Sequence, residues 1–202
     1  MNQVTVRNIT FGEGRPKICV PITGRTKEEI ALRTAELKAV EPDLAEWRAD
    51  WYEEVFDRKK LESMLVWLRK ELGELPLLVT FRTKEEGGEQ SVSLEDYAAF
   101  LRTVLMSGQA DLIDVELFRG EKLLRDICKE AKAQGVKVIA SSHDFEKTPA
   151  KEEILARLIR MQDCGADLLK LAVMPRDAGD VLTLLSATWE MKEQYAKQPV
   201  VT

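Results

Sequence analysis

Residues 112–143 read LIDVELFRGEKLLRDICKEAKAQGVKVIASSH, and their pattern of apolar and polar residues is the clearest indication of the fold. Two short apolar runs, Leu112–Leu117 and Val136–Ser141, enclose an amphipathic stretch at Glu121–Gln134. Runs of this kind are typical of strands buried in a parallel sheet, and the amphipathic stretch is typical of the helix that connects them. Gly135 lies where such a helix is expected to end. The segment therefore predicts one β-α-β unit.

The same alternation continues in both directions along the chain. Strands are also expected at Lys17–Ile22, Leu44–Arg48, Leu77–Phe81, Leu168–Val173 and Pro199–Thr202. Helices are also expected at Lys27–Val40, Arg58–Leu72, Leu94–Ser107, Lys151–Cys164 and Asp180–Ala196, with Gly73, Gly108 and Gly165 near helix ends. Strand starts recur at intervals of roughly 25 to 35 residues, the size of one βα unit. The pattern favours an α/β fold built as a (β/α) barrel in a single domain, residues 1–202.

A doubly wound nucleotide-binding sheet is the main alternative architecture. Such sheets usually carry GxGxxG or GxxxxGK[ST] directly after a strand, because the glycines let the backbone approach a phosphate. Neither pattern follows any expected strand of this sequence. The barrel is therefore favoured, and it is expected to be incomplete, with about six βα units followed by the start of a seventh strand.

Composition limits the possible partners and compartments. The 202 residues suffice for one substantial core, and 35 acidic residues outnumber 30 basic ones that are dispersed among them, so nucleic acid is not an expected partner. Three cysteines form no CxxC pair and no cluster with the histidine, which predicts neither a disulfide framework nor a metal site and fits a cytoplasmic location. The sequence has no apolar N-terminal segment and no run of about 18 apolar residues, so neither export nor a membrane span is expected.

The expected strands end in polar residues, which is where a (β/α) barrel carries its catalytic groups. Glu46 and Arg48 alternate onto one face of the second strand, and Arg82 follows the third. Asp114 and Glu116 are spaced by two inside the apolar fourth strand, so both would face the barrel interior or its mouth and need partners there. Ion pairs of this kind also occur as purely structural contacts, and that interpretation stays open here.

Two further residues indicate a reaction. His143, the only histidine, directly follows the strand at Val136–Ser141, and its near-neutral pKa suits proton transfer. Lys170 lies in the apolar run Leu168–Val173, where desolvation would lower the pKa of the amine and favour Schiff-base chemistry. A histidine after a strand is often only a hydrogen-bonded loop residue, and a lysine can extend from a strand edge into water. Both alternatives remain open from the residues alone.

In combination these residues resemble the type I 3-dehydroquinate dehydratases over the length of the chain. The matching segments share order and spacing, and they are Pro16–Val20, Glu46–Asp50, Thr80–Arg82, Glu86–Gln90, Asp114–Leu117, Ser142–Phe145, and Lys170 with Met174-Pro175. The resemblance implies that Lys170 is the Schiff-base lysine, His143 the general acid and base, and Glu86 the carboxylate that orients the imidazole. It also implies substrate binding by Glu46, Arg48 and Arg82.

The resemblance implies the reaction and the assembly as well. The family's fold is a (β/α)8 barrel, usually in a homodimer. Its members convert 3-dehydroquinate to 3-dehydroshikimate in the shikimate pathway of aromatic amino acid biosynthesis, and they use no metal or organic cofactor. The expected partner of this chain is therefore a small-molecule substrate, with a second copy of the chain if the barrel is intact.

One departure from the family pattern concerns the end of the sequence. Family members continue for roughly two further βα units, which carry an arginine for the substrate carboxylate and a loop that closes over the ring. Loss of one charge-assisted contact typically weakens binding by about 1.5 to 3 kcal/mol, so weak or absent activity is expected of the shortened chain, with instability or self-association at open sheet edges. The alternatives are another Schiff-base barrel enzyme, such as an aldolase, and a noncatalytic barrel fragment.

Overall fold

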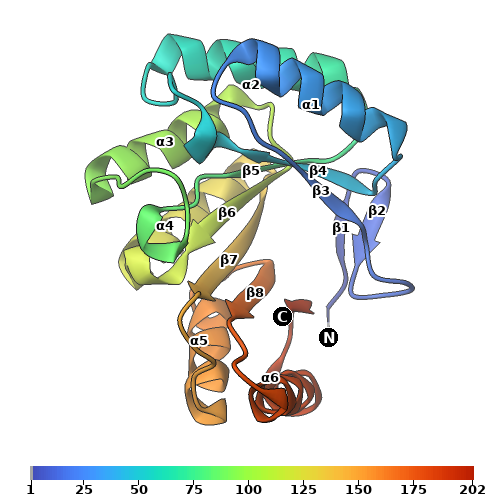
Figure 1. The fold of residues 1–202 in the computed structure, drawn as a ribbon, viewed down its shortest axis with the longest axis vertical. Helices are drawn as coiled ribbons and strands as arrows, with labels where there is room; N and C mark the ends of the chain where they lie inside the picture. The colour runs from blue at the N-terminus through green and yellow to red at the C-terminus, as the bar shows by residue number, and fades with distance from the viewer. Residues whose placement is uncertain (1) are drawn as a thin grey trace.

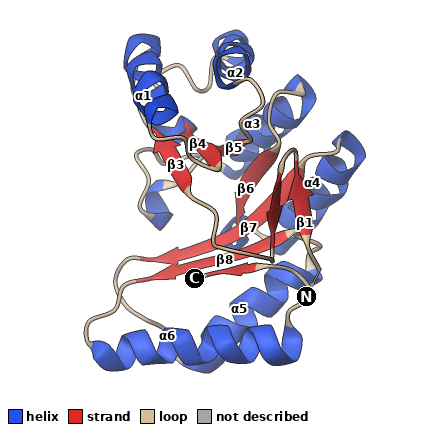
Figure 2. Ribbon diagram, turned by 90° about the vertical axis from the view of Figure 1, so that its right-hand side faces the viewer, coloured by secondary structure: helices blue, strands red, loops and turns tan. Residues whose placement is uncertain are grey.

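The computed structural model describes residues 2–202 and confirms the α/β fold class. Seven parallel strands pair in chain order from β3 to β9 in one curled sheet, and the pairing ends at these two strands. The helices cover the outer face of the sheet, so the described chain has the shape of a partial barrel (Figures 1 and 2). Because consecutive strands are neighbours throughout, the architecture is a run of βα units rather than a doubly wound sheet.

The parallel strands alternate with six α-helices, and two shorter strands precede them. The strands are β1 (Val4–Val6), β2 (Ile9–Phe11), β3 (Cys19–Ile22), β4 (Leu44–Arg48), β5 (Leu77–Thr80), β6 (Leu112–Glu116), β7 (Lys137–Asp144), β8 (Leu168–Val173) and β9 (Val200–Val201). The helices are α1 (Lys27–Ala39), α2 (Arg58–Leu72), α3 (Leu94–Ser107), α4 (Glu121–Gln134), α5 (Lys151–Asp163) and α6 (Ala178–Glu190). Short 3₁₀ turns follow β4, β5 and β6, at Ala49–Trp51, Lys84–Glu86 and Leu117–Arg119.

The predicted strands and helices all occur in the described chain, with one element missed. The antiparallel hairpin of β1 and β2 was not predicted, because each strand has three residues and alternation over so short a segment does not stand out. The last predicted helix, Asp180–Ala196, is divided in the structure, since a π-helical segment at Met191–Tyr195 continues α6. The incomplete barrel expected from the sequence is thus confirmed as a half-barrel sheet.

Local sequence explains where the helices begin and end. The side chains of Asp57 and Ser93 accept hydrogen bonds from the first free amides of α2 and α3, which satisfies donors that have no partner within a helix. Gly108 and Gly135 end α3 and α4 in the left-handed conformation, with φ of 65° and 74°, which residues with a side chain rarely adopt. These stops return the chain to the N-terminal edge of the sheet for each new strand.

Two separate cores hold the fold together. The larger one fills the space between the sheet and the helices. The smaller one lies inside the curl, where each of five neighbouring strands contributes one apolar side chain from Leu44, Leu78, Leu112, Ile139 and Leu168. The hairpin covers this inner cluster with Val4, Val6 and Ile9, all at most 7% exposed. The N-terminal end of the curl is therefore closed by apolar packing.

A group of ion pairs fixes the hairpin over that closed end. The Arg7 Nε lies 2.7 Å from Asp111 Oδ1, and Asp111 also pairs with Arg69 at 2.9 Å and accepts the Leu77 amide at 2.8 Å. The hairpin, helix α2 and the starts of two strands thus meet at one carboxylate.

Among residues 2–202, no helix combines the length and the apolar character that crossing a membrane would require.

Candidate active site

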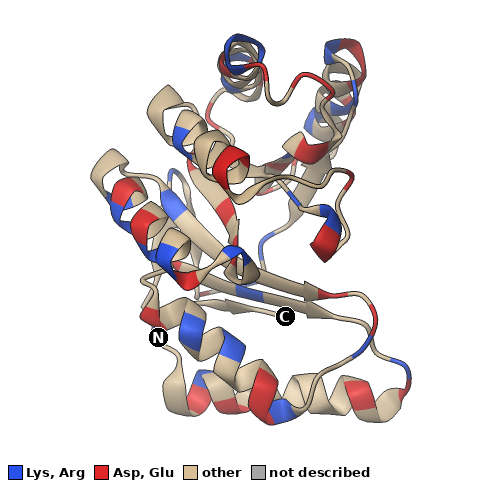
Figure 3. Cartoon of the chain, turned by 90° about the vertical axis from the view of Figure 1, so that its left-hand side faces the viewer, with Lys and Arg blue, Asp and Glu red and all other residues tan. Residues whose placement is uncertain are grey.

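Polar side chains replace the apolar ones two residues further along the same strands. Strand side chains alternate between faces, so the inward positions that follow the apolar cluster are two residues later. They are Glu46 on β4, Thr80 on β5, Asp114 on β6, Ser141 on β7 and Lys170 on β8. Figure 3 shows charged residues on the strands themselves as well as on the helices. The C-terminal half of the interior is therefore a polar layer, as expected for the catalytic end of a barrel.

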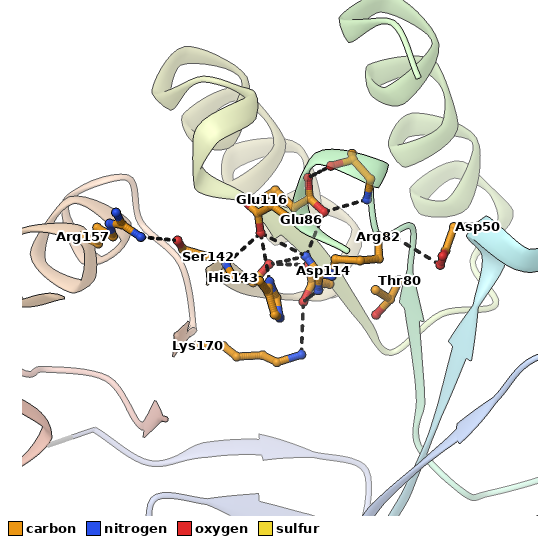
Figure 4. Close-up of polar contacts among 12 residues, drawn as sticks. Asp50, Thr80, Arg82, Glu86, Asp114, Glu116, Ser142, His143, Arg157 and Lys170 are labelled. Carbon is orange, nitrogen blue, oxygen red and sulfur yellow. Dashed lines mark hydrogen bonds and ion pairs between the residues drawn. The ribbon is translucent and has the colours of Figure 1, made fainter. Parts of the chain in front are cut away.

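Arg82 is the hub of this layer. Its guanidinium lies 2.9 Å from Glu116 Oε1, 2.9 Å from Asp114 Oδ2 and 3.0 Å from Ser141 Oγ, and the side chain is only 5% exposed (Figure 4). Burial works against the charged form of Arg82, but the two carboxylates outweigh it and raise the pKa of the guanidinium. The partners that the sequence analysis required for Asp114 and Glu116 are thus supplied within the chain by Arg82.

His143 and Glu86 form a buried pair beside that hub. The Glu86 Oε2 atom lies 2.9 Å from His143 Nδ1 and also accepts the His143 amide at 3.0 Å. Burial is the largest influence on both groups: it lowers the pKa of His143 to about 3 and raises the pKa of Glu86 to about 8. Both shifts favour the neutral forms, so at neutral pH the pair is a neutral carboxylic acid beside a neutral imidazole rather than an ion pair.

Lys170 extends from β8 toward the same layer. The register pairs Lys170 with Ser141 of β7, and its Nζ atom lies 3.8 Å from Asp114 Oδ2. The side chain is 27% exposed, and its aliphatic neighbours, Leu169 and Leu171, pack on the outer face of the sheet. The expected enclosure of the amine by aliphatic side chains was therefore wrong, since strand alternation places those side chains on the other side of the sheet.

Glu46 and Arg48 lie on β4, on the other side of Arg82 from Lys170. Glu46 accepts a hydrogen bond of 2.7 Å from Thr80 Oγ1, while the Arg48 guanidinium is held by Asp50 through two bonds of 2.8 Å. Asp114 thus links Lys170 to Arg82, and Arg82 in turn lies 3.6 Å from Glu86 Oε2, the partner of His143, so these four predicted residues belong to one contact network. It places Glu46 and Arg48 on the adjoining strand, with side chains that face the same interior.

Several polar residues of this network were not among the predicted site residues. Ser141 donates to Asp114 at 2.6 Å, and Thr83 donates to Glu116 at 2.7 Å from its hydroxyl and at 2.9 Å from its amide. Their signal in the sequence is weak, because a serine or threonine at an inward strand position also occurs in ordinary sheets. Period-two alternation along the predicted strand at Val136–Ser141 would have identified Ser141 as an inward-facing candidate.

The network has no features of a metal site within the part of the chain that the structure describes. No three His, Cys, Asp or Glu side chains among residues 2–202 are arranged to hold a metal ion.

A surface hollow of about 460 Å³ between α1 and α2 is lined by exposed groups such as Arg25 and Lys60 and includes no residue of the network. Because the chemically distinctive side chains converge at the strand ends, we place the candidate site there rather than in the hollow.

Fold and site together define a class of protein. The chain is a half-barrel of βα units that presents a lysine amine and a buried histidine–carboxylate pair at the C-terminal ends of its strands, where barrel enzymes carry their active sites. The profile of the family described as type I 3-dehydroquinase matches residues 18–202. This chain belongs to the type I 3-dehydroquinase family.

Individual relatives agree with that assignment. The 3-dehydroquinate dehydratase of Syntrophotalea carbinolica is 50% identical over 202 residues, which are all of this chain and 80% of that protein. A crystal structure of the Clostridium difficile type I 3-dehydroquinate dehydratase, described with covalently modified comenic acid, superposes with a TM-score of 0.96 at 49% identity and covers 99% of this chain and 79% of that one. A deoxyribose phosphate aldolase from Aeropyrum pernix, with a TM-score of 0.57 at 17% identity, shares the fold alone.

Proposed function

We propose that this chain is a hydro-lyase that dehydrates 3-dehydroquinate to 3-dehydroshikimate through an imine on Lys170. Membership of the type I 3-dehydroquinase family supports the overall reaction. One observation carries the assignment of residues: Lys170 on β8 and His143 on β7 lie on neighbouring strands and face one interior, two residues apart along the register. A nucleophilic amine and a proton-transfer group are thus adjacent at the end of the barrel where catalysis occurs.

The proposed chemistry begins with the ketone of the substrate. The Lys170 amine attacks C3, and the carbinolamine takes up one proton and loses water to give an iminium that withdraws electrons from the adjacent carbon and acidifies its C2 proton. The Asp114 carboxylate, 3.8 Å from Nζ, would lie beside the positive iminium. Hydrolysis of the imine at the end of the cycle restores the free amine, so that the net change is loss of one water from the substrate.

His143 is proposed to move the protons. Because burial lowers its pKa, the imidazole is neutral at physiological pH and can accept the C2 proton as a general base. The imidazolium formed in that step can then donate to the departing C1 hydroxyl. Glu86, whose two bonds to His143 fix both the ring and the main chain, is proposed to hold the imidazole in this orientation.

Substrate recognition is assigned to the side chains on β4 and to Arg82. Glu46 and Arg48 are partly exposed and lie at inward positions of β4, which supports direct contact with substrate hydroxyls or carboxylate. Arg82 is already engaged by Asp114, Glu116 and Ser141, so a direct contact with substrate would have to be shared with these groups. Its role in binding therefore stays a prediction.

The place of the reaction and the assembly are also proposals. The dehydratase reaction belongs to the shikimate pathway, whose intermediates are soluble small molecules, and a cytoplasmic location and a homodimer are proposed for this chain. We propose no organic cofactor, because an imine on Lys170 supplies the electron sink that the elimination needs. Nucleic acid and membrane are not proposed as partners.

The test is a trapping experiment. The protein is incubated with 3-dehydroquinate and sodium borohydride, which reduces an imine to a stable secondary amine even when turnover is slow. Intact-mass analysis and peptide mapping then locate the modification, with the S. carbinolica dehydratase as a positive control. We expect one adduct per chain at Lys170. An adduct at any other lysine, or no adduct beside a modified control, would contradict the proposed function.

A further inference from the structure

Asp50 is a fully buried carboxylate in the turn that follows β4. Its side chain is 0% exposed. The Oδ1 atom accepts a bond from the Arg82 amide at 3.2 Å (Figure 4) and one from Arg48 Nε at 2.8 Å. The Oδ2 atom accepts bonds from Arg48 Nη2 at 2.8 Å and from the Glu89 amide at 3.2 Å. One carboxylate thus contacts a candidate substrate-binding side chain and two amides of the segment that carries Glu86.

That segment, residues 82–90, is folded closely upon itself. The Gly88 amide donates to the Thr83 carbonyl at 2.8 Å and the Lys84 amide to the Gln90 carbonyl at 2.9 Å. A Cβ atom at Gly88 would lie 1.8 Å from the Arg82 carbonyl oxygen, so the backbone here approaches as only glycine allows. Because Asp50 holds an amide near each end of this segment, the position of Glu86 within it depends on Asp50.

We infer that Asp50 is a positioning residue that fixes Arg48 and the Glu86-bearing segment to each other, so that one carboxylate aligns substrate binding with proton transfer at His143. The inference rests on the proposed function, because that function gives Arg48 and Glu86 their roles. Each Asp50 oxygen already accepts two hydrogen bonds, which leaves no free acceptor for a substrate group. Asp50 therefore acts through its neighbours and is not itself catalytic.

The substitution Asp50→Asn tests the hydrogen bonds of this side chain while leaving its buried volume nearly unchanged. The amide has nearly the same shape as the carboxylate, but it has one acceptor oxygen and one NH₂ group. Both sites are surrounded by donors, so in either orientation the NH₂ group faces two N–H groups and two hydrogen bonds are lost. The variant thus frees one arm of the Arg48 guanidinium together with an amide of the Glu86-bearing segment.

The first readout is the concentration of 3-dehydroquinate that gives half-maximal trapping at Lys170. For Asp50→Asn we expect an increase of about tenfold or more, as for the loss of a hydrogen bond to a charged group. The double variant Asp50→Asn/Arg48→Ala should bind no more weakly than Arg48→Ala, because Asp50 acts on binding through Arg48. Asp43→Asn, at the opposite end of β4, is the matched control and should leave the value unchanged. Additive effects in the double variant would contradict the inference.

The second readout is the NMR signal of the imidazole, which reports on His143 alone because the chain has a single histidine. Asp50→Asn should shift this signal through displacement of Glu86, whereas Asp43→Asn should not. This measurement needs no substrate. If wild-type protein forms no adduct, the proposed function has failed; if it forms the adduct and Asp50→Asn leaves both the half-maximal concentration and the imidazole signal unchanged, the inference has failed.

A second variant approaches the same contact from the more exposed side. Arg48→Lys retains the charge but cannot bind both oxygens of Asp50, because an ammonium lacks the planar fork of the guanidinium. It is used where Asp50→Asn does not fold, as judged by circular dichroism and thermal unfolding. The expected result is again a higher half-maximal concentration of 3-dehydroquinate. Wild-type trapping by Arg48→Lys would overturn the inference, since the paired contact would then have no effect on binding.

Discussion

The two ends of the curled sheet have opposite interiors. At the N-terminal end, the inward side chains are apolar, from Leu44 on β4 to Leu168 on β8, and the hairpin of β1 and β2 covers them. At the C-terminal end, two residues further along the same strands, the inward side chains are charged or hydroxylated, and they include Asp114 and Lys170. A shift of about 7 Å along a strand therefore separates a packed core from a candidate active site.

The apolar end stabilises the fold, whereas the polar end supplies the candidate catalytic groups. Burying apolar surface stabilises the fold, whereas burying a charge costs free energy unless the charge is paired. Arg82, Asp114 and Glu116 meet that condition by pairing with one another. We expect substitutions at the apolar end to change stability and leave imine formation intact. Removal of the Lys170 amine at the polar end should do the reverse, because Asp114 stays paired with Arg82.

The largest expected effect is at the polar end. Lys170→Met keeps most of the side-chain volume but removes the amine, so borohydride trapping should fall to zero while the midpoint of thermal unfolding changes little. The matched control is Lys137→Met, a lysine on neighbouring β7 at the N-terminal end of the sheet, where it pairs with Asp167. The control should trap the imine as wild type does. Residual adduct in Lys170→Met would mean that another lysine reacts.

The next effect lies at the apolar end. Leu112→Ala removes a fully buried side chain from the inner cluster and leaves a cavity beneath the hairpin, which typically costs about 2 to 5 kcal/mol in the free energy of unfolding. Chemical denaturation measures this loss. Trapping at Lys170 by the folded fraction should be retained. Loss of trapping in a protein that is still folded would show that the two ends are not independent.

The sequence predicts the apolar end and the polar end unequally well. Strand positions and the alternation of Leu112, Asp114 and Glu116 follow from periodicity, because a sheet has only two faces. The hairpin that closes the apolar end does not follow, since Val4–Val6 and Ile9–Phe11 are too short for a clear pattern and are stabilised by distant contacts such as Arg7 with Asp111. Local sequence contains no record of such contacts.

The candidate site shows the same division. Lys170, His143 and Arg82 stand out in the sequence because a charged or titratable residue in or beside an apolar strand needs a reason. The partners that hold them are set by the curl of the sheet. It brings Glu86 into hydrogen-bonding contact with the backbone amide of His143, which lies 57 residues later in the chain. The role of Asp50 depends on the fold of residues 82–90 and could not be read from its place beside Arg48.

A pH-dependent effect tests the buried pair at the polar end. Unfolded Glu and His have pKa values of about 4.3 and about 6.5, so the unfolded chain has lost both protons above pH 6.5. The folded chain keeps one on Glu86, whose pKa is raised to about 8, and stability therefore falls as the pH rises from about 6.5 to 8. At about 1.4 kcal/mol per pH unit, the free energy of unfolding falls by about 2 kcal/mol over this window.

Glu86→Gln should remove that slope, because the amide does not titrate. The measurement is the free energy of unfolding of the variant and of wild type at several pH values between 6 and 8.5. Glu85→Gln, one residue earlier and exposed, is the control and should keep the wild-type slope. Parallel curves for wild type and Glu86→Gln would mean that folded Glu86 is ionised and that His143 is oriented by a carboxylate rather than by a carboxylic acid.

The smallest expected effect concerns the ion pairs at the closed end. Arg7 has a φ of 49°, which asparagine tolerates better than most residues, so Arg7→Asn removes the guanidinium without adding backbone strain. Asp111 retains its bonds to Arg69 and to the Leu77 amide, and partly exposed ion pairs contribute little, so the loss should be about 1 kcal/mol or less. Glu74→Gln, which removes only the exposed partner of Arg7, should have no measurable effect. Arg7→Asn could instead destabilise the chain as strongly as Leu112→Ala does. The hairpin would then be held by its charges rather than by Val4, Val6 and Ile9, and the contrast between an apolar end and a charged end would not hold.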